Sequence, residues 1–435
     1  MTEMIFLGAG ASIDAGVPAA YDMTKQVLGL FENDRNLVKH TQVLRFVVGG
    51  LLFQEGVQGR DPFNGINVEE LFNAIELLAT RDQLEASPFI GSWHQRIKDL
   101  DRVEISSQDT DELKDILYQA VLNDLSIEVN EPTWKPGKID QEIGNLFAKL
   151  ASRHPRPASP GKEIIDILNE LKLGLKNRHR GSDYHFRTRI STLVNRVSQT
   201  GGGRIFQETS RHMIQRLVDM VWIDDVTKTD YLSPLISYAG KNNLVIASLN
   251  YDNAIELAAN KANMPLTTGI ETWSNTGQFS RPQNGIYLLK LHGSIDWHFK
   301  QMGSSPDKPM PHQIIEKIPE PTKTREYYQP ALIFGQRNKL TAKGPFLDLL
   351  QEFNRALQET KQLTIIGYSF RDEHINEIIG QWLNGARDRH LRIINGSKFA
   401  QNPPEFIQTI HKGAMKRIQL TQYCAADGIK EFYDQ

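Results

Sequence analysis

The sequence predicts an α/β protein, in which a parallel sheet has helices on both faces and a large helical domain is inserted into the chain. Three observations predict this fold. A short apolar run, Met4 to Leu7, ends in closely spaced glycines. After residue 240, several short apolar runs each end in polar residues. Between them, apolar residues recur mainly at helical spacing. We therefore expect an α/β core at residues 1–35 and 241–435, with a helical insertion domain at residues 36–240.

The composition limits the class of protein. The 435 residues are 40% hydrophobic and 23% charged, as in ordinary soluble globular proteins. A formal net charge of −2 argues against general affinity for nucleic acid. Cys424 is the only cysteine, which excludes an internal disulfide and suits a reducing cytosol. No apolar run reaches the roughly 20 residues that cross a bilayer, and no signal peptide precedes the first run. We expect a cytoplasmic protein with no membrane segment.

The N-terminal run is typical of a buried strand that leads through a tight turn into a helix. Gly8-Ala9-Gly10-Ala11-Ser12 follows it directly, and Gly16-Val17-Pro18 comes soon afterwards. Glycine lets another backbone or a ligand approach, and free amides at a helix start can hold a phosphate. This is the opening of a Rossmann-like dinucleotide-binding fold. Ile13 stands where the usual G-x-G-x-x-G pattern has its third glycine, so a tight turn without a ligand stays an alternative.

The insertion is expected to be helical. Residues 21–31 should form the helix after the first loop, and residues 68–79 place apolar side chains on one stripe, with Asn67 as the cap. Further helices are expected at residues 111–125, 139–151, 163–175 and 206–222. Residues 171–216 carry ten Lys or Arg against two acidic residues. Solvated helix faces explain this run as well as a phosphate-rich or acidic partner does, so direct nucleic-acid binding stays open.

Five short apolar runs follow residue 240, each ending in polar residues. The runs are residues 244–247, 286–291, 331–334, 363–366 and 391–394. The polar ends include Asn250 and Asp252, His292, Gln336, Gly367 and Ser369, and Asn395. Helices between several of the runs indicate a parallel sheet covered on both faces. Because ligands of such sheets bind beyond the carboxyl ends of the strands, these residues should gather at one solvent-accessible site.

In this order, the motifs resemble the catalytic core of the sirtuins. The resemblance covers residues 4–20 and 244–396, and the strings SLNYDNAIE, LKLHGSIDW and IIGYSFRDEHIN are similar to the sirtuin-like NADases of bacterial anti-phage defence. It implies that the first loop holds the NAD pyrophosphate, and that Gly367, Ser369 and Asn395 contact the ribose and adenine. The residues of the first loop are Gly8, Ala9, Gly10, Ala11, Ser12, Gly16 and Pro18.

The resemblance also implies that Asn250 and Asp252 lie around the nicotinamide and its ribose, and that His292 acts on the ribose. The residue chemistry agrees. Cleavage of the bond between nicotinamide and ribose develops an oxocarbenium-like sugar, so a catalyst must orient the carboxamide, stabilise positive charge and position a nucleophile. A carboxylate, an amide and an imidazole can do this. Alternatively, Asn250 and Asp252 could cap the next helix, and His292 could be a turn histidine. Asp372 is expected to be a helix cap or a member of an ion pair.

The chain departs from deacylase sirtuins in two places. Those proteins carry four zinc cysteines after the His-Gly motif, where this chain has the proline-rich residues 303–330 and no cysteine. The Pro-x-Phe-Arg continuation of the first motif is also missing, so the residue that closes over the nicotinamide stays open. Histidines show no metal-ligand spacing either, and we expect no metal site.

These departures favour hydrolysis of NAD+ to nicotinamide and ADP-ribose over deacylation. The resemblance implies that the chain is the NAD-depleting effector of an anti-phage system. The alternative is a non-catalytic subunit that senses NAD or ADP-ribose within a larger assembly. A homo-oligomer larger than a dimer is expected. The resemblance further implies a HerA-type hexameric ATPase as the partner.

Overall fold

The computed structural model describes residues 2–59, 65–84, 95–100, 203–323, 330–333 and 344–434. The helices expected at residues 111–125, 139–151 and 163–175 lie outside the described residues, as does most of the basic run at residues 171–216. The contacts divide the chain into two compact units, residues 1–74 with 210–435 and residues 75–209. The boundaries expected from the sequence, at residues 35 and 240, stay a prediction.

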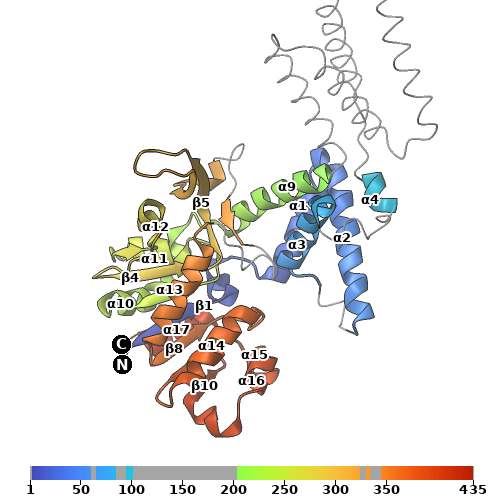
Figure 1. The fold of residues 1–435 in the computed structure, drawn as a ribbon. Helices are drawn as coiled ribbons and strands as arrows, with labels where there is room; N and C mark the ends of the chain where they lie inside the picture. The colour runs from blue at the N-terminus through green and yellow to red at the C-terminus, as the bar shows by residue number, and fades with distance from the viewer. Residues whose placement is uncertain are drawn as a thin grey trace, which may run out of the picture. The chain divides into compact units, whose positions relative to one another are not determined.

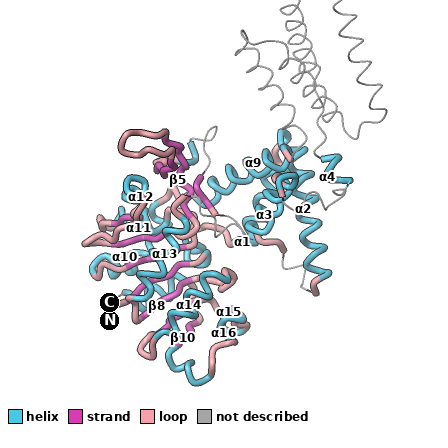
Figure 2. Tube along the Cα trace, viewed as in Figure 1, coloured by secondary structure: helices cyan, strands magenta, loops and turns pink. Residues whose placement is uncertain are grey.

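A seven-stranded parallel sheet forms the centre of the first unit (Figures 1 and 2). Its strand order is β10-β9-β8-β1-β2-β4-β3. The strands are β1 (Glu3–Leu7), β2 (Val245–Ser248), β3 (Leu266–Thr267), β4 (Ile286–Lys290), β8 (Gln362–Ile366), β9 (His390–Ile394) and β10 (Ile418–Thr421). The N-terminal strand lies in the middle because Met4 to Leu7 are buried, and a strand covered on both faces is apolar throughout.

The chain leaves β1 and builds the sheet outward on both sides of it. β2 pairs with one edge of β1, and β8 pairs with the other. After the strand ends, the Gly8 amide donates to Ile366 O at 2.9 Å, and the Leu249 amide donates to Leu7 O at 3.0 Å. The first loop is therefore fixed at the carboxyl edge, where the strand order changes direction and ligands of open sheets bind.

Helices cover both faces of the sheet. On one face, Phe6 contacts Phe353, with ring centroids 5.6 Å apart, in a core that α13 and α14 share. On the other face, Tyr238 of α10 and Tyr433 of α17 both bond to the Glu3 carboxylate. The helices are α10 (Ser233–Lys241), α11 (Ala254–Lys261), α12 (Ile270–Thr276), α13 (Phe346–Gln358), α14 (Glu373–Gly385), α15 (Ser397–Gln401), α16 (Glu405–Gln408) and α17 (Ala425–Tyr433). The predicted parallel α/β fold is confirmed.

One predicted strand of this sheet lies elsewhere. The apolar run at residues 331–334 was expected to join the parallel sheet, and that prediction is wrong. Instead β7 (Pro330–Leu332) pairs antiparallel with β5 (Gly293–Met302), whose other edge pairs with β6 (His312–Lys317). An apolar run predicts a strand but does not identify its partner. Part of the proline-rich stretch thus forms β6, and the sequence did not indicate β3, β5, β6 or β10.

The helices before the sheet agree with the periodicity. Helix α3 runs over the expected residues, Val68–Ala79, and Asn67 caps it by accepting from the Glu69 amide at 2.9 Å. The others are α1 (Ala20–Glu32), α2 (Val38–Val57), α4 (Gln95–Leu100) and α9 (Arg204–Val221). Within the second unit, the Arg81 guanidinium lies 5.6 Å from the centre of the Phe206 ring. No helix in the described part of the chain has both the length and the apolar character that crossing a membrane requires.

Candidate active site

A pocket of about 1010 Å³ opens at the carboxyl edge of the parallel sheet. Its volume is at the upper end of the roughly 300–1,000 Å³ of small-molecule sites, so a dinucleotide can be accommodated. Expected site residues that line it are Ala9, Gly10, Pro18, Asn250, Asp252, His292, Gly367, Ser369 and Asn395. Ala11 and Ser12 line a smaller cavity instead, and Gly8 and Gly16 line neither of the two.

The glycines of the first loop are explained by contact between two loops. The Gly10 amide donates to Gly367 O at 2.8 Å. A Cβ on Gly10 would lie 2.8 Å from Gly367 Cα, and a Cβ on Gly8 would lie 2.5 Å from Tyr368 Cα. Gly367 itself has φ 66°, a left-handed conformation that disfavours other residues. The glycines are therefore needed for this backbone contact, whether or not a ligand is bound.

The same contact changes one expectation about the first loop. Residues Ala9–Ala15 form the 3₁₀ helix η1, and the amides of Gly10 and Ala11 donate to Gly367 O and Gly8 O. Amides at the start of the helix after β1 were expected to be free for a phosphate, and these two amides in the first turn of η1 are not free. Their hydrogen bonds hold the loop against β8, and α1 begins only after Pro18.

Asn250 ties the loop after β2 to the loop after β1. Its Nδ2 donates to Gly8 O at 3.0 Å and to Ser12 Oγ at 2.8 Å. Its Oδ1 has no hydrogen-bond partner among the described residues, so this oxygen is the atom left for a ligand. Asn250 is 9% exposed and His292 is 6% exposed, so the expectation of open, solvent-accessible side chains is wrong. The loops that follow the strands pack over both residues.

Asp252 combines the two roles that the sequence left open. Its Oδ1 accepts from the Ala254 amide at 3.0 Å, which caps the start of α11, while the residue also lines the large pocket. The cap fixes the carboxylate but occupies only one of its oxygens. Asn253 is the N-cap residue of α11 but makes no side-chain cap hydrogen bond, because its side chain bonds to the backbone N and O of Ile223.

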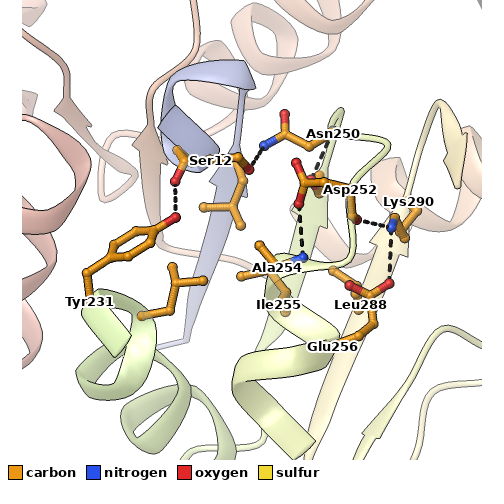
Figure 3. A pocket seen from close by; sticks show the side chains of 13 residues that line it. Ser12, Tyr231, Asn250, Asp252, Ala254, Ile255, Glu256, Leu288 and Lys290 are labelled. Carbon is orange, nitrogen blue, oxygen red and sulfur yellow. Dashed lines mark hydrogen bonds and ion pairs between the residues drawn. The ribbon is translucent and has the colours of Figure 1, made fainter. Parts of the chain in front are cut away.

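A second, much smaller cavity adjoins Asn250 and Asp252 (Figure 3). Its volume of about 10 Å³ has room for one water at most. The Tyr231 hydroxyl donates to Ala11 O at 2.6 Å beside it. Burial, together with the carboxylates of Asp252 and Asp14, raises the pKa of Tyr231, so the phenol keeps its proton as a donor. The small cavity cannot hold a dinucleotide, whereas the large pocket has the volume to do so.

His292 is paired with a carboxylate. Its Nε2 lies 3.2 Å from Asp372 Oδ2, and both side chains are buried. Its Nδ1 is buried and has no hydrogen-bond partner in the described part of the chain. Asp372 also caps α14 through the Ile375 amide, so its expected role as a helix cap is observed. A carboxylate beside an imidazole fixes the ring and stabilises its protonated form.

Further residues at the pocket were not singled out from the sequence. The Arg371 guanidinium lies 4.8 Å from the centre of the Tyr21 ring and donates to the Tyr21 hydroxyl. The Tyr251 hydroxyl lies 2.8 Å from Ile333 O and 3.2 Å from Glu69 Oε1. Burial first, and then Glu69, raises the pKa of Tyr251 well above its ordinary value. The signal that could have found Tyr251 and Arg371 was their position in the loops that follow β2 and β8.

Residues 244–412 match the SIR2-like domain family. The matched segment is less than half of the chain. The matched segment begins one residue before β2, and it includes Asn250, Asp252 and His292 but not the first loop. SIR2-like domains are commonly NAD-dependent enzymes, so the match supports a sirtuin-like family and implies that the chain binds NAD. No curated protein gives a significant match to the chain. Among the residues that the structure describes, no three His, Cys, Asp or Glu side chains are grouped as a metal site would require.

Proposed function

We propose that the chain is an NAD+ hydrolase that produces nicotinamide and ADP-ribose. The observation that carries the proposal is the meeting of Asn250, Asp252 and His292 at one pocket of about 1010 Å³ in a SIR2-like domain. The pocket is large enough for the whole dinucleotide. Its polar side chains come from the ends of β2 and β4, while the first loop lies between β2 and β8.

The three side chains supply what the reaction needs. The Asp252 carboxylate accepts from the nicotinamide carboxamide and stabilises positive charge that develops on the ribose. Asn250 presents its Oδ1 to a ribose hydroxyl or to the attacking water, because its Nδ2 is already bonded to Gly8 O and Ser12 Oγ. Holding these groups in place lowers the entropic part of the barrier.

His292 acts as the base, held by Asp372. Water adds its oxygen to the anomeric carbon of the ribose, and the bond between that carbon and the nicotinamide nitrogen breaks. Nicotinamide leaves as a neutral molecule with the electron pair of the broken bond. The proton lost by water passes to the imidazole, whose protonated form the Asp372 carboxylate stabilises from 3.2 Å. Solvent then takes the proton.

Incubation of the purified full-length chain with NAD+, followed by chromatography, tests the proposal. Nicotinamide and ADP-ribose should be released in equal amounts, and His292→Ala should release both at least about 100-fold more slowly. The non-catalytic alternative gives a different result, namely calorimetric binding of NAD+ with no release of nicotinamide. Release of nicotinamide without ADP-ribose would show that another acceptor replaces water.

We extend the proposal to the cellular role, supported by the resemblance of the strings around Asn250, His292 and Gly367 to defence NADases. The chain would deplete NAD during phage infection, as a homo-oligomer larger than a dimer, beside a HerA-type hexameric ATPase. Light scattering after size-exclusion chromatography, with and without a candidate ATPase, tests the assembly. A monomer at micromolar concentration would contradict the oligomer, and unchanged elution with the ATPase would contradict the pairing.

A further inference from the structure

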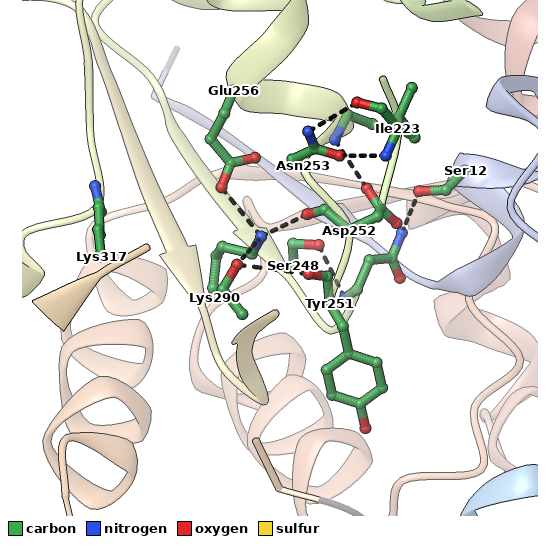
Figure 4. Close-up of polar contacts among 12 residues, drawn as sticks. Ser12, Ile223, Ser248, Tyr251, Asp252, Asn253, Glu256, Lys290 and Lys317 are labelled. Atoms are coloured by element: carbon green, nitrogen blue, oxygen red, sulfur yellow. Dashed lines mark hydrogen bonds and ion pairs between the residues drawn. The ribbon is translucent and has the colours of Figure 1, made fainter. Parts of the chain in front are cut away.

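Lys290, the last residue of β4, is a buried cation with three partners (Figure 4). Only 1% of its side chain is exposed. Its Nζ donates to the carbonyl oxygen of Asp252, to Glu256 Oε1 at 3.0 Å and to Ser294 Oγ at 2.7 Å. An ammonium group has three donors, and here each has an oxygen partner from a different segment of the chain. Lysine is rarely buried so completely unless it is paired in this way.

The surroundings keep this group charged. Burial opposes the positive charge, but the carboxylates of Glu256, Asp296 and Asp252 outweigh it and raise the pKa of Lys290 above its ordinary value. The ammonium is therefore present across the neutral range. Its hydrogen bonds are charge-assisted, which makes them shorter and stronger than bonds between neutral groups.

Two of the three partners of Lys290 lie at the turns that carry the proposed catalytic residues, and the third, Glu256, lies in α11. The Asp252 carbonyl is part of the turn after β2, which also carries Asn250. Ser294 comes two residues after His292, at the start of β5. The Lys290 ammonium therefore binds the main-chain carbonyl of Asp252 and the side-chain hydroxyl of Ser294. It fixes the distance between the segments that carry these two residues.

Two further hydrogen bonds restrict the backbone of the same segments. The Ile295 amide donates to Tyr251 O at 3.1 Å, directly beside the Lys290 contacts. The Ala254 amide donates to the Asp252 carboxylate at 3.0 Å. Without the ammonium, the Asp252 carbonyl and the Ser294 hydroxyl would lose a buried donor, and the turns could shift to recover one.

We propose that Lys290 is a positioning residue of the active site, whose ammonium fixes Asp252 relative to His292 in the geometry that the reaction requires. Lys290 does not line the large pocket, so it acts through these residues and not on the substrate. The inference rests on the proposed function, since it concerns the geometry of the residues assigned to hydrolysis. Displacement of reacting groups by about 1 Å can cost about 100-fold in rate, so a distant anchor can control turnover.

Steady-state kinetics of the full chain with NAD+ tests this role. Lys290→Met keeps the length of the side chain and removes its charge and donors. We expect kcat to fall by about 10–100-fold, with KM within about threefold of wild type because the pocket wall is unchanged. Lys261→Met is the matched control. Lys261 lies at the end of α11, and the substitution removes its surface ion pair with Asp230. It should leave kcat and KM unchanged.

Ser294→Ala decides the case in which Lys290→Met does not fold. It removes one partner of the ammonium and leaves the charge in place, and it should lower kcat by several-fold in a variant that is less stable but still folded at the assay temperature. If a folded Lys290→Met kept kcat within about twofold of wild type, the proposal would be overturned. The same result for Ser294→Ala would overturn it when Lys290→Met is insoluble.

Hydrogen exchange separates a failure of this inference from a failure of the proposed function. If wild type releases no nicotinamide, the proposed hydrolysis is wrong. Exchange of the Ala254 and Ile295 amides in Lys290→Met still reports the geometry of the two segments. If Lys290→Met does not fold, the same amides are measured in Ser294→Ala. Faster exchange at these amides, with an unchanged Gly8 amide, would support the positioning role. Unchanged exchange at all three would overturn it.

Discussion

His292 Nε2 lies 3.2 Å from Asp372 Oδ2, although 80 residues separate them in the sequence. The contact arises because β4 and β8 end at the same edge of the parallel sheet, on either side of β1 and β2. Asp372 is itself fixed as the cap of α14. The position of the imidazole is therefore set by a carboxylate that the helix holds in place.

The pair makes a testable prediction about catalysis. Asp372→Asn removes the charge beside His292, while asparagine remains a good N-cap for α14. Because a general base contributes about 100–10,000-fold to rate, we expect kcat for NAD+ to fall by about 10–100-fold. In His292→Ala, kcat should fall further. The double variant should have the same kcat as His292→Ala alone, as measured by nicotinamide release.

The double-mutant cycle also states what would contradict this pairing. If the two substitutions had independent, multiplicative effects on kcat, Asp372 would not act through His292. If Asp372→Asn lost as much thermal stability as Asp372→Ala, which deletes the cap, the role of Asp372 would be to cap α14 alone.

A second prediction concerns the backbone contact between the first loop and the loop after β8. A Cβ at Gly10 meets Gly367 backbone, which cannot move aside as a flexible side chain could. We expect Gly10→Ala to destabilise the fold by about 1–3 kcal/mol in urea unfolding. Gly29→Ala is the matched control: nothing lies within 4 Å of its new Cβ, and it is inside α1. It should be neutral or stabilise by up to about 1 kcal/mol. Equal effects at both sites would refute the close approach.

A third prediction separates structure from catalysis at Asn250. Asn250→Ala removes the donor to Gly8 O and Ser12 Oγ, so it should lower the free energy of unfolding by about 1–3 kcal/mol as well as abolish turnover. Calorimetry with NAD+ at a temperature where the variant is folded shows whether binding survives. A variant with wild-type stability would mean that the two hydrogen bonds do not hold the first loop.

A fourth prediction follows from the raised pKa of Lys290. A group whose pKa is higher in the folded state stabilises the fold fully below its unfolded value, and the stabilisation is lost as pH rises through the folded value. The difference in melting temperature between wild type and Lys290→Met should therefore persist at neutral pH and narrow only above the ordinary value of 10.5. A difference that disappears between pH 6 and pH 8 would show that the ammonium is not the stabilising group.

The sequence predicted what local patterns determine. The apolar run of β1 indicated a buried strand, and the spacing at residues 68–79 with Asn67 predicted α3 with its cap. The sequence also predicted that Asn250, Asp252 and His292 lie near one another after strand ends, because parallel strands end at one edge of the sheet.

The rest depends on contacts between distant residues. The bond from Asn250 to Gly8 O spans 242 residues, and no local pattern indicates it. The partner of β7 was mispredicted for the same reason. Lys290 could have been noticed as a lone charge within the apolar run of β4, which is a known sign of a paired buried group.

The most direct test of hydrolysis compares two forms of the full chain that both bind NAD+. Wild type and His292→Ala are incubated with NAD+ at equal occupancy, verified by calorimetry, and nicotinamide and ADP-ribose are measured over time. The account predicts many turnovers by wild type, with the two products in equal amounts, and turnover at least about 100-fold slower by the variant. Binding without any product from wild type, or equal turnover by His292→Ala, would contradict it.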